Sequence, residues 1–172
     1  GGLGGVLTLS TKGSESMRID SSGNLLVGGT AYPNGSASNF GVNSGGQIAT
    51  SRATTGSSAH AVFHNTNGVV GSIFTSGSAT AFNTSSDQRL KDNIADADDA
   101  GYKIDAIQVR KYDWKADGSH QDYGMIAQEL QLIAPEAVSG DADSEEMMGV
   151  DYSKLVPMLI KEIQSLRNRV AT

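Results

Sequence analysis

The first 85 residues of this chain contain too few large apolar side chains to build a hydrophobic core of their own. Sixteen of the 21 glycines lie before Ser86, whereas only five of the 32 charged residues do. Between Tyr32 and Ala59 the large apolar residues are isolated among Gly, Ser, Thr and Asn. A monomer of this composition cannot bury enough apolar area to offset its conformational entropy. The segment is therefore either disordered or completed by other chains.

Short alternating apolar segments favour completion by other chains. Each is bounded by Gly, Asn or Ser, a pattern typical of β-strands separated by turns. Strands of several chains wrapped about one axis need only a narrow apolar stripe each, and Gly and Ser permit close approach at that axis. We therefore predict that residues 1–85 form an all-β fibre segment, intertwined as a homotrimer. The predicted strands lie at residues 6–9, 17–20, 25–27, 61–63 and 69–74.

From Ser86 onward the chain is acidic and periodic, with a net charge of −7 against +1 for the preceding part. Segments 97–107 and 127–133 have helical spacing of apolar residues, whereas 108–115, 122–126, 137–138 and 147–150 favour strands. This change of pattern predicts a second domain, residues 86–172, of the α+β class.

The domain is expected to end in a long helix over residues 153–170. Its apolar residues are spaced 4, 3, 4, 3 and 4 apart, as in the a/d positions of a heptad repeat. Pro157 falls in the first turn, where the missing amide costs little. Two interpretations stay open, an oligomerisation seam and a face that packs on its own domain. The residues of this stripe are Tyr152, Val156, Leu159, Ile163, Leu166 and Val170.

Charge and composition exclude several functions. A net charge of −6 makes nucleic acid a poor partner, because binding to phosphates needs clustered Lys and Arg. No cysteine is available for disulfides or zinc thiolates. No apolar run approaches the roughly 20 residues of a membrane helix, so we expect no membrane insertion. We also expect no cofactor.

Two histidines, His60 and His64, are the only hint of a metal. If they lie on one strand, their positions are about 13 Å apart, too far to share an ion within a chain. We expect them to be solvated or stacked at a threefold axis and predict no metal site, although an axial ion stays open.

The junction between the two parts contains a hydroxyl and an amine suited to nucleophilic chemistry, Ser86 and Lys91. A serine needs a base within hydrogen-bond reach, and a lysine can serve only in its neutral form. Burial or a neighbouring positive charge such as Arg89 would favour that form. Ser86 and Lys91 are five positions apart. Their side chains would diverge on a helix and would lie on opposite faces of a strand. A dyad therefore requires a bend between them or a lysine supplied by another subunit.

Two stretches resemble phage proteins. The stretch Met17-Arg18-Ile19-Asp20-Ser21-Ser22-Gly23-Asn24-Leu25-Leu26-Val27-Gly28 resembles a module common in phage tail-fibre and appendage proteins. Ser86-Asp87-Gln88-Arg89-Leu90-Lys91-Asp92-Asn93-Ile94 closely resembles the start of the intramolecular chaperone, auto-processing domain at the C-terminus of phage tailspikes, endosialidases and neck or tail fibres. The similarity continues through Tyr112-Asp113-Trp114, Gly124-Met125-Ile126-Ala127-Gln128-Glu129, Pro135-Glu136, Val150-Asp151-Tyr152 and Leu155-Val156-Pro157.

The resemblance implies a trimeric chaperone that templates folding of the upstream fibre segment, its client, and then cuts itself off. It implies cleavage of the Ser85–Ser86 bond, with Ser86 as nucleophile, Lys91 as base, and positioning roles for Asp87, Arg89 and Asn93. It further implies a virion tail fibre or appendage made in the host cytoplasm, from which the chaperone domain is released.

The alternative is a structural receptor-binding tip of a trimeric fibre, which is never cleaved and binds a host surface receptor. Tyr112, Trp114 and Tyr123 could form a glycan platform for it, although we expect core packing of a β-ribbon instead. A hydrolase acting on external substrates is disfavoured, since no His or acid cluster suggests a triad.

Overall fold

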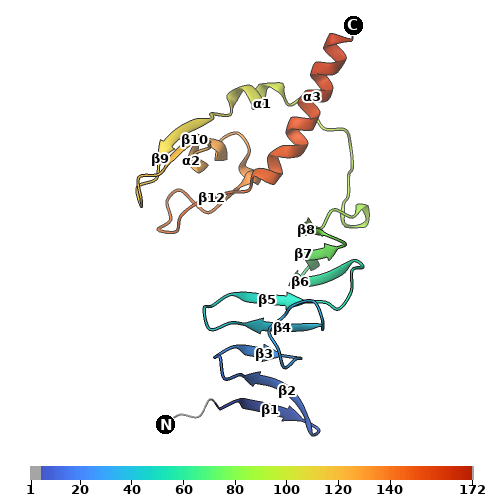
Figure 1. The fold of residues 1–172 in the computed structure, drawn as a ribbon. Helices are drawn as coiled ribbons and strands as arrows, with labels where there is room; N and C mark the ends of the chain where they lie inside the picture. The colour runs from blue at the N-terminus through green and yellow to red at the C-terminus, as the bar shows by residue number, and fades with distance from the viewer. Residues whose placement is uncertain (1–4, 172) are drawn as a thin grey trace. The chain divides into compact units, whose positions relative to one another are not determined.

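The structure is mostly β, with a few short helices and one longer helix near the C-terminus (Figure 1). The computed structural model describes residues 5–171. By its internal contacts the chain divides into two units, Gly1–Asp92 and Asn93–Thr172. The secondary structure agrees with the predicted mixture of elements, whereas the intertwined trimer and the domain bounds 1–85 and 86–172 stay predictions.

The N-terminal unit begins with an antiparallel meander of five strands in sequence order. Lys12 and Gly13 connect the first two strands with φ angles of 51° and 79°, which is the backbone of a type I′ hairpin turn. In the next turn the Asp20 carboxylate accepts hydrogen bonds from the backbone N–H groups of Ser22 and Asn24, both at 2.9 Å. The strands are β1 (Leu7–Thr11), β2 (Ser14–Ile19), β3 (Leu25–Val27), β4 (Asn39–Val42) and β5 (Ile48–Ser51).

A second antiparallel sheet follows, formed by β6 (Ser58–Asn65), β7 (Gly68–Ser76) and β8 (Ala79–Thr84). The central strand is β7, so β8 is an edge strand within the chain. The β7–β8 ladder runs from the pair Ser76↔Ala79 to the pair Gly71↔Thr84. This sheet therefore brings the chain to the junction at the end of β8.

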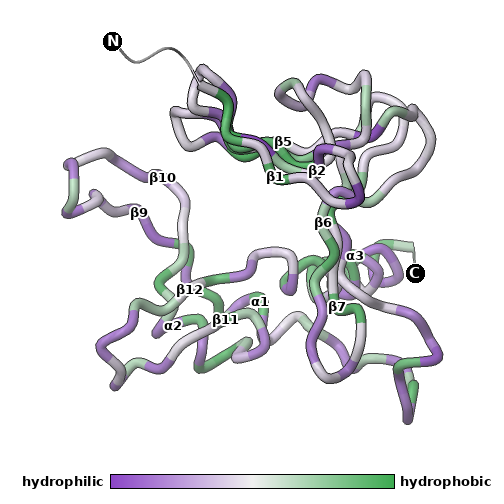
Figure 2. The backbone as a smooth tube through the Cα atoms, turned by 90° about the horizontal axis from the view of Figure 1, so that it is seen from below, coloured by the Kyte–Doolittle hydropathy of each residue, from purple (hydrophilic) through white to green (hydrophobic). Residues whose placement is uncertain are grey.

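The N-terminal unit has almost no core of its own. Leu26 is the only buried apolar side chain among its described residues. Apolar residues appear in Figure 2 as short runs in the strands, separated by neutral or hydrophilic turns. Phe82 on the edge strand is 78% exposed and Phe63 on β6 is 54% exposed. The sheets are held by backbone hydrogen bonds and leave their apolar side chains largely unburied in one chain.

The C-terminal unit contains a small core. Its buried residues are Leu130, Ala134, Ala137 and Leu155. Partly buried apolar residues surround it, including Met125, Val138 and Val150. The elements of this unit are α1 (Gly101–Ala106), β9 (Arg110–Asp113), β10 (His120–Gly124), α2 (Ala127–Gln131), β11 (Val138–Ser139), β12 (Gly149–Val150) and α3 (Val156–Val170), with 3-10 turns η2 (Pro135–Ala137) and η3 (Tyr152–Leu155).

The strands predicted in the first half are confirmed as β1, β2, β3, β6 and β7. Three strands were not predicted: β4, β5 and β8. Their residues include many Gly, Ala, Ser, Asn and Thr side chains, which carry little apolar signal. Pairing with neighbouring strands makes these segments extended.

The helices α1 and α3 begin later than predicted, whereas α2 begins at Ala127 as predicted and ends two residues early. The segment 97–107 becomes helical only at Gly101, whose N–H donates to the Asp99 carboxylate at 2.9 Å. The terminal helix, expected from residue 153, begins as the 3-10 turn η3, which is capped by Asp151, and becomes α-helical at Val156. Within residues 5–171, no helix combines the length and the apolar character needed to cross a membrane.

Candidate active site at the Ser85–Ser86 junction

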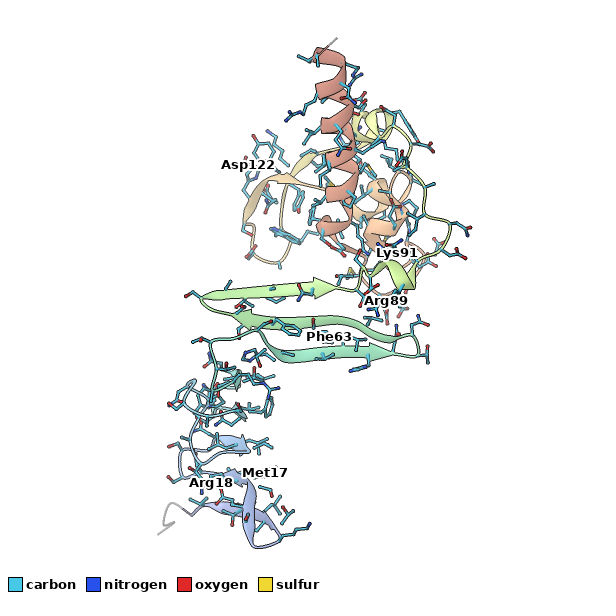
Figure 3. All side chains as sticks on the ribbon, turned by 90° about the vertical axis from the view of Figure 1, so that its right-hand side faces the viewer. Met17, Arg18, Phe63, Arg89, Lys91 and Asp122 are labelled. Carbon is cyan, nitrogen blue, oxygen red and sulfur yellow. The ribbon has the colours of Figure 1, made fainter. Side chains whose placement is uncertain are left out.

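A single turn of 3-10 helix, η1 (Gln88–Leu90), follows the edge strand β8. Asp87 caps this turn, because its carboxylate accepts a hydrogen bond from the backbone N–H of Arg89 at 2.8 Å. The backbone N–H of Lys91 donates to the carbonyl of Gln88 at 3.0 Å and closes the turn. Figure 3 labels Arg89 and Lys91 on this turn.

The turn brings the Lys91 amine to the Ser86 hydroxyl. Lys91 Nζ donates to Ser86 Oγ at 2.8 Å within one chain. The spacing of five positions between Ser86 and Lys91 requires a bend in the chain, and the turn η1 provides it. A lysine from another subunit is therefore not required for the contact. The catalytic roles of Ser86 and Lys91 stay predictions, since a hydrogen bond alone does not establish chemistry.

The two adjacent serines have different partners. Ser85 Oγ donates to the carbonyl of Val69 at 2.8 Å, and the Ser85 N–H donates to the carbonyl of Val70 at 3.2 Å. Ser85 is thus attached to strand β7, while Ser86 faces the amine. The sequence shows two neighbouring hydroxyls and cannot distinguish them in this way. Sequence reasoning assigned Ser85 only as the residue before the cut and missed this attachment.

Arg89 pairs with Asp87. Its Nε and Nη2 donate to the Asp87 carboxylate at 3.0 and 2.7 Å. The side-chain hydrogen bonds from Arg89, followed by its backbone N–H, hold the pKa of Asp87 below its usual value. The guanidinium of Arg89 is thus engaged by this carboxylate, and its role as the positive neighbour of Lys91 stays a prediction. Asn93, the remaining motif residue, has a φ of 51°.

Both dyad side chains are exposed in the single chain. The contact between Ser86 and Lys91 is therefore an arrangement of the right atoms at the surface of the single chain.

The two histidines of β6 have different surroundings. His60 Nδ1 and Nε2 lie 2.6 and 2.9 Å from the hydroxyls of Thr50 and Thr75, so both ring nitrogens have partners. His64 is exposed on the same strand. Among residues 5–171 no group of three or more His, Cys, Asp or Glu side chains is arranged for a metal ion.

The aromatic residues of the β9–β10 hairpin line an open groove of about 1010 Å³ in the C-terminal unit. Tyr112 and Trp114 meet edge to face, with their ring centroids 5.4 Å apart. Trp114 is 53% and Tyr123 80% exposed, so the expected core packing does not occur for these two residues within one chain. Met147 and Met148 lie across the same groove.

Comparison with known proteins gives one match. A family model named for a peptidase and described as "chaperone of endosialidase" matches residues 86–139. The match begins at Ser86, includes the turn and the β9–β10 hairpin, and supports a C-terminal chaperone domain with autoproteolysis in general terms. No curated protein and no solved structure matches the chain.

Proposed function

We propose that this chain is a trimeric fibre segment joined to an intramolecular chaperone, which templates folding of the segment and then cuts the Ser85–Ser86 bond with a Ser86–Lys91 dyad. The observation that carries the proposal is the hydrogen bond from Lys91 Nζ to Ser86 Oγ at the start of the matched residues. The setting we propose is a phage tail fibre or appendage, made in the host cytoplasm.

The reaction begins with attack of Ser86 Oγ on the carbonyl carbon of Ser85, the preceding residue. Neutral Lys91 accepts the hydroxyl proton and returns it to the departing Ser86 nitrogen. The Ser85–Ser86 peptide bond breaks, and an ester joins the Ser85 acyl group to Ser86 Oγ. Water then hydrolyses the ester, leaving a carboxylate on Ser85 and a free amine and hydroxyl on Ser86.

Association of chains supplies the missing burial. A compact monomer of this mass, 17.9 kDa, exposes about 8,000 Å², and two separate domains of half that mass expose about 9,700 Å² together. This chain exposes 12966 Å². The excess is of the size that obligate interfaces bury. Burial of Lys91 in such an interface favours its neutral amine and links cleavage to assembly.

A trimer is supported by two unpaired surfaces. The edge strand β8 is exposed along its whole length, and an uncovered edge can pair with another chain. The a/d residues of α3 are also exposed, with Leu159 at 46%, Ile163 at 55% and Leu166 at 46%. An exposed heptad seam on a helix is completed by the same seam of other copies.

A chaperone is useful to such a fibre for a physical reason. Strands that pair between chains must find their register before any contact compensates the loss of entropy. A domain that trimerises first holds three fibre segments together and raises their effective concentration. Its removal leaves a fibre that cannot easily refold and is therefore kinetically stable.

The test is the mass of freshly purified full-length protein and of two variants, Ser86→Ala and Lys91→Ala. The proposal predicts a C-terminal piece that starts at Ser86 in the wild type and a single uncut chain in both variants, with trimers still formed. Lys111→Ala removes another exposed lysine and should cleave normally. Normal cleavage in Lys91→Ala would remove Lys91 from the mechanism.

The second candidate is the uncleaved receptor-binding tip, favoured by the exposed groove beside Trp114 and Tyr123. It predicts an intact wild-type chain in the same mass measurement. It also predicts that Trp114→Ala abolishes binding to host cells without changing the trimer.

A further inference from the structure

We infer that the Ser85 side chain is a positioning residue that attaches the scissile peptide to the folded β6–β8 sheet, so that cleavage depends on that sheet. The inference rests on the proposed function, because it concerns the acyl side of the bond that the Ser86–Lys91 dyad would cut. The dyad itself lies on the other side of that bond.

Ser85 continues the β7–β8 ladder one residue beyond the end of β8. The last ladder pair is Gly71↔Thr84, and the Ser85 N–H donates to Val70, the next residue of β7. Gly71 keeps this approach uncrowded, because a Cβ there would lie 3.2 Å from the carbonyl oxygen of Asn83. The residue before the cut is therefore part of the sheet.

The side chain adds a second bond to the same strand. Ser85 Oγ donates to the carbonyl of Val69 at 2.8 Å, next to the Val70 carbonyl that accepts the backbone N–H. Two hydrogen bonds to consecutive carbonyls restrain rotation about the Ser85 backbone. With only one of them, the Ser85 backbone could still rotate. The proton of the Ser85 hydroxyl is directed at the Val69 carbonyl, so it is not offered to the Lys91 amine.

The residues on the two sides of the scissile bond are held by different elements of the structure. The turn capped by Asp87 holds Ser86 and Lys91, and strand β7 holds Ser85. An intramolecular attack is fast only when the nucleophile and the carbonyl are kept in a near-attack geometry. A chain in which β8 has not paired with β7 keeps the turn but leaves the Ser85 carbonyl free to rotate. Cleavage thus waits for the client sheet.

The experiment follows cleavage of full-length protein after pulse-labelled cell-free synthesis, on denaturing gels, for variants of Ser85. Ser85→Ala and Ser85→Val remove the hydroxyl and should slow the first-order cleavage about tenfold, the effect of one lost hydrogen bond. Ser85→Thr keeps the hydroxyl, and its cleavage rate should lie within about a factor of two of the wild-type rate. Thr84→Ala, which changes the preceding exposed side chain of β8, is the matched control and should cleave normally.

A positioning role also predicts that the pH at half-maximal rate is the same in Ser85→Ala as in the wild type, because the base is unchanged. The positioning role of Ser85 (the Ser85 anchor) is wrong, and the proposed function stands, if Ser85→Ala cleaves as fast as the wild type while Ser86→Ala does not cleave. It is equally wrong if Ser85→Thr is as slow as Ser85→Ala. A wild-type chain that is never cut would overturn the proposed function and this inference with it. Native mass of each variant shows whether slow cleavage reflects loss of the trimer, which would count against the anchor.

Discussion

At the scale of single residues, the junction is shaped by one carboxylate that accepts three hydrogen bonds from a single arginine. Asp87 receives the backbone N–H, Nε and Nη2 of Arg89. The Asp87 side chain is therefore placed to hold the turn that returns Lys91 to Ser86. Asp87 and Arg89 bind each other, and positioning is the role that these contacts support.

Replacing Asp87 tests this role. Asp87→Ala removes all three bonds, and we expect the cleavage rate to fall about tenfold as the turn loosens. Arg89→Ala removes only the side-chain bonds and leaves the capping N–H bond, so its effect should be smaller. The rates are measured by the gel assay used for Ser85. Equal rates for Asp87→Ala and the wild type would show that the turn does not need its cap.

The pH dependence of the rate separates Asp87 from the base. The pKa of Asp87 is lowered, first by the Arg89 side-chain hydrogen bonds. Its stabilisation of the turn is thus complete above the unfolded pKa of about 3.9 and is lost as the pH falls through the lower folded pKa. We therefore expect Asp87→Asn to change the rate without moving the midpoint of the profile between about pH 5 and 8. A shifted midpoint would place Asp87 in direct contact with the titrating group.

At the scale of elements, the C-terminal unit depends on a core of few residues. Leu130 on α2 is 2% exposed, whereas Leu132, two positions later, is 87% exposed. We expect Leu130→Ala to destabilise the unit by about 2–5 kcal/mol and Leu132→Ala to have little effect. Urea unfolding of full-length Ser86→Ala protein, followed by fluorescence of its single tryptophan, Trp114, measures both. Equal destabilisation by the two changes would contradict the observed core.

The apolar stripe of α3 is exposed in the single chain and would be buried by contact with a partner. Ile163 lies within the stripe, and Gln164 is the adjacent exposed residue outside the heptad positions. We expect Ile163→Asp to dissociate the trimer, because a carboxylate in an apolar seam is costly to bury. Gln164→Asp is the control and should leave the trimer intact. Native mass of the full chain decides, and a trimer that survives Ile163→Asp would exclude the α3 seam as an essential interface.

At the scale of the whole molecule, the two units differ in how far each can fold alone. The N-terminal unit has a single buried apolar side chain among its described residues, while the C-terminal unit has a small core. This difference agrees with a client that needs help and a chaperone that provides it.

The fragment 1–85 tests this dependence directly. Produced alone, it should aggregate or stay monomeric and poorly ordered, because its strands lack both a core and a template. The full-length chain produced in parallel is the control and should yield trimers. Native trimers formed by the fragment alone would remove the need for a chaperone. Size-exclusion chromatography with light scattering gives the oligomeric state of each.

The prediction of elements succeeded where the side chains carry a strong pattern. The apolar repeats at β1, β2, β3, β6 and β7 and the heptad stripe of α3 are readable because burial or pairing selects such residues at fixed spacing. β4, β5 and β8 could not be predicted, since their small and polar residues carry little apolar pattern and become strands by pairing with the strand before them in the chain. The start of α1 was misplaced because Asp99 lies before the helix, where its carboxylate binds the N–H of Gly101, and not in the first turn.

The order of residues alone shows that a glycine-rich segment without a core is joined to an acidic domain, and that Ser86 and Lys91 are five positions apart at the junction. Composition and spacing are properties of the chain and need no folding to be read. The folded chain is needed to see that a capped 3-10 turn brings Lys91 Nζ to Ser86 Oγ, and that Ser85 is bound to Val69 and Val70 of β7. The first contact depends on the path of the backbone through the turn, and the second on the register of β8 against β7, and neither can be read from composition or spacing.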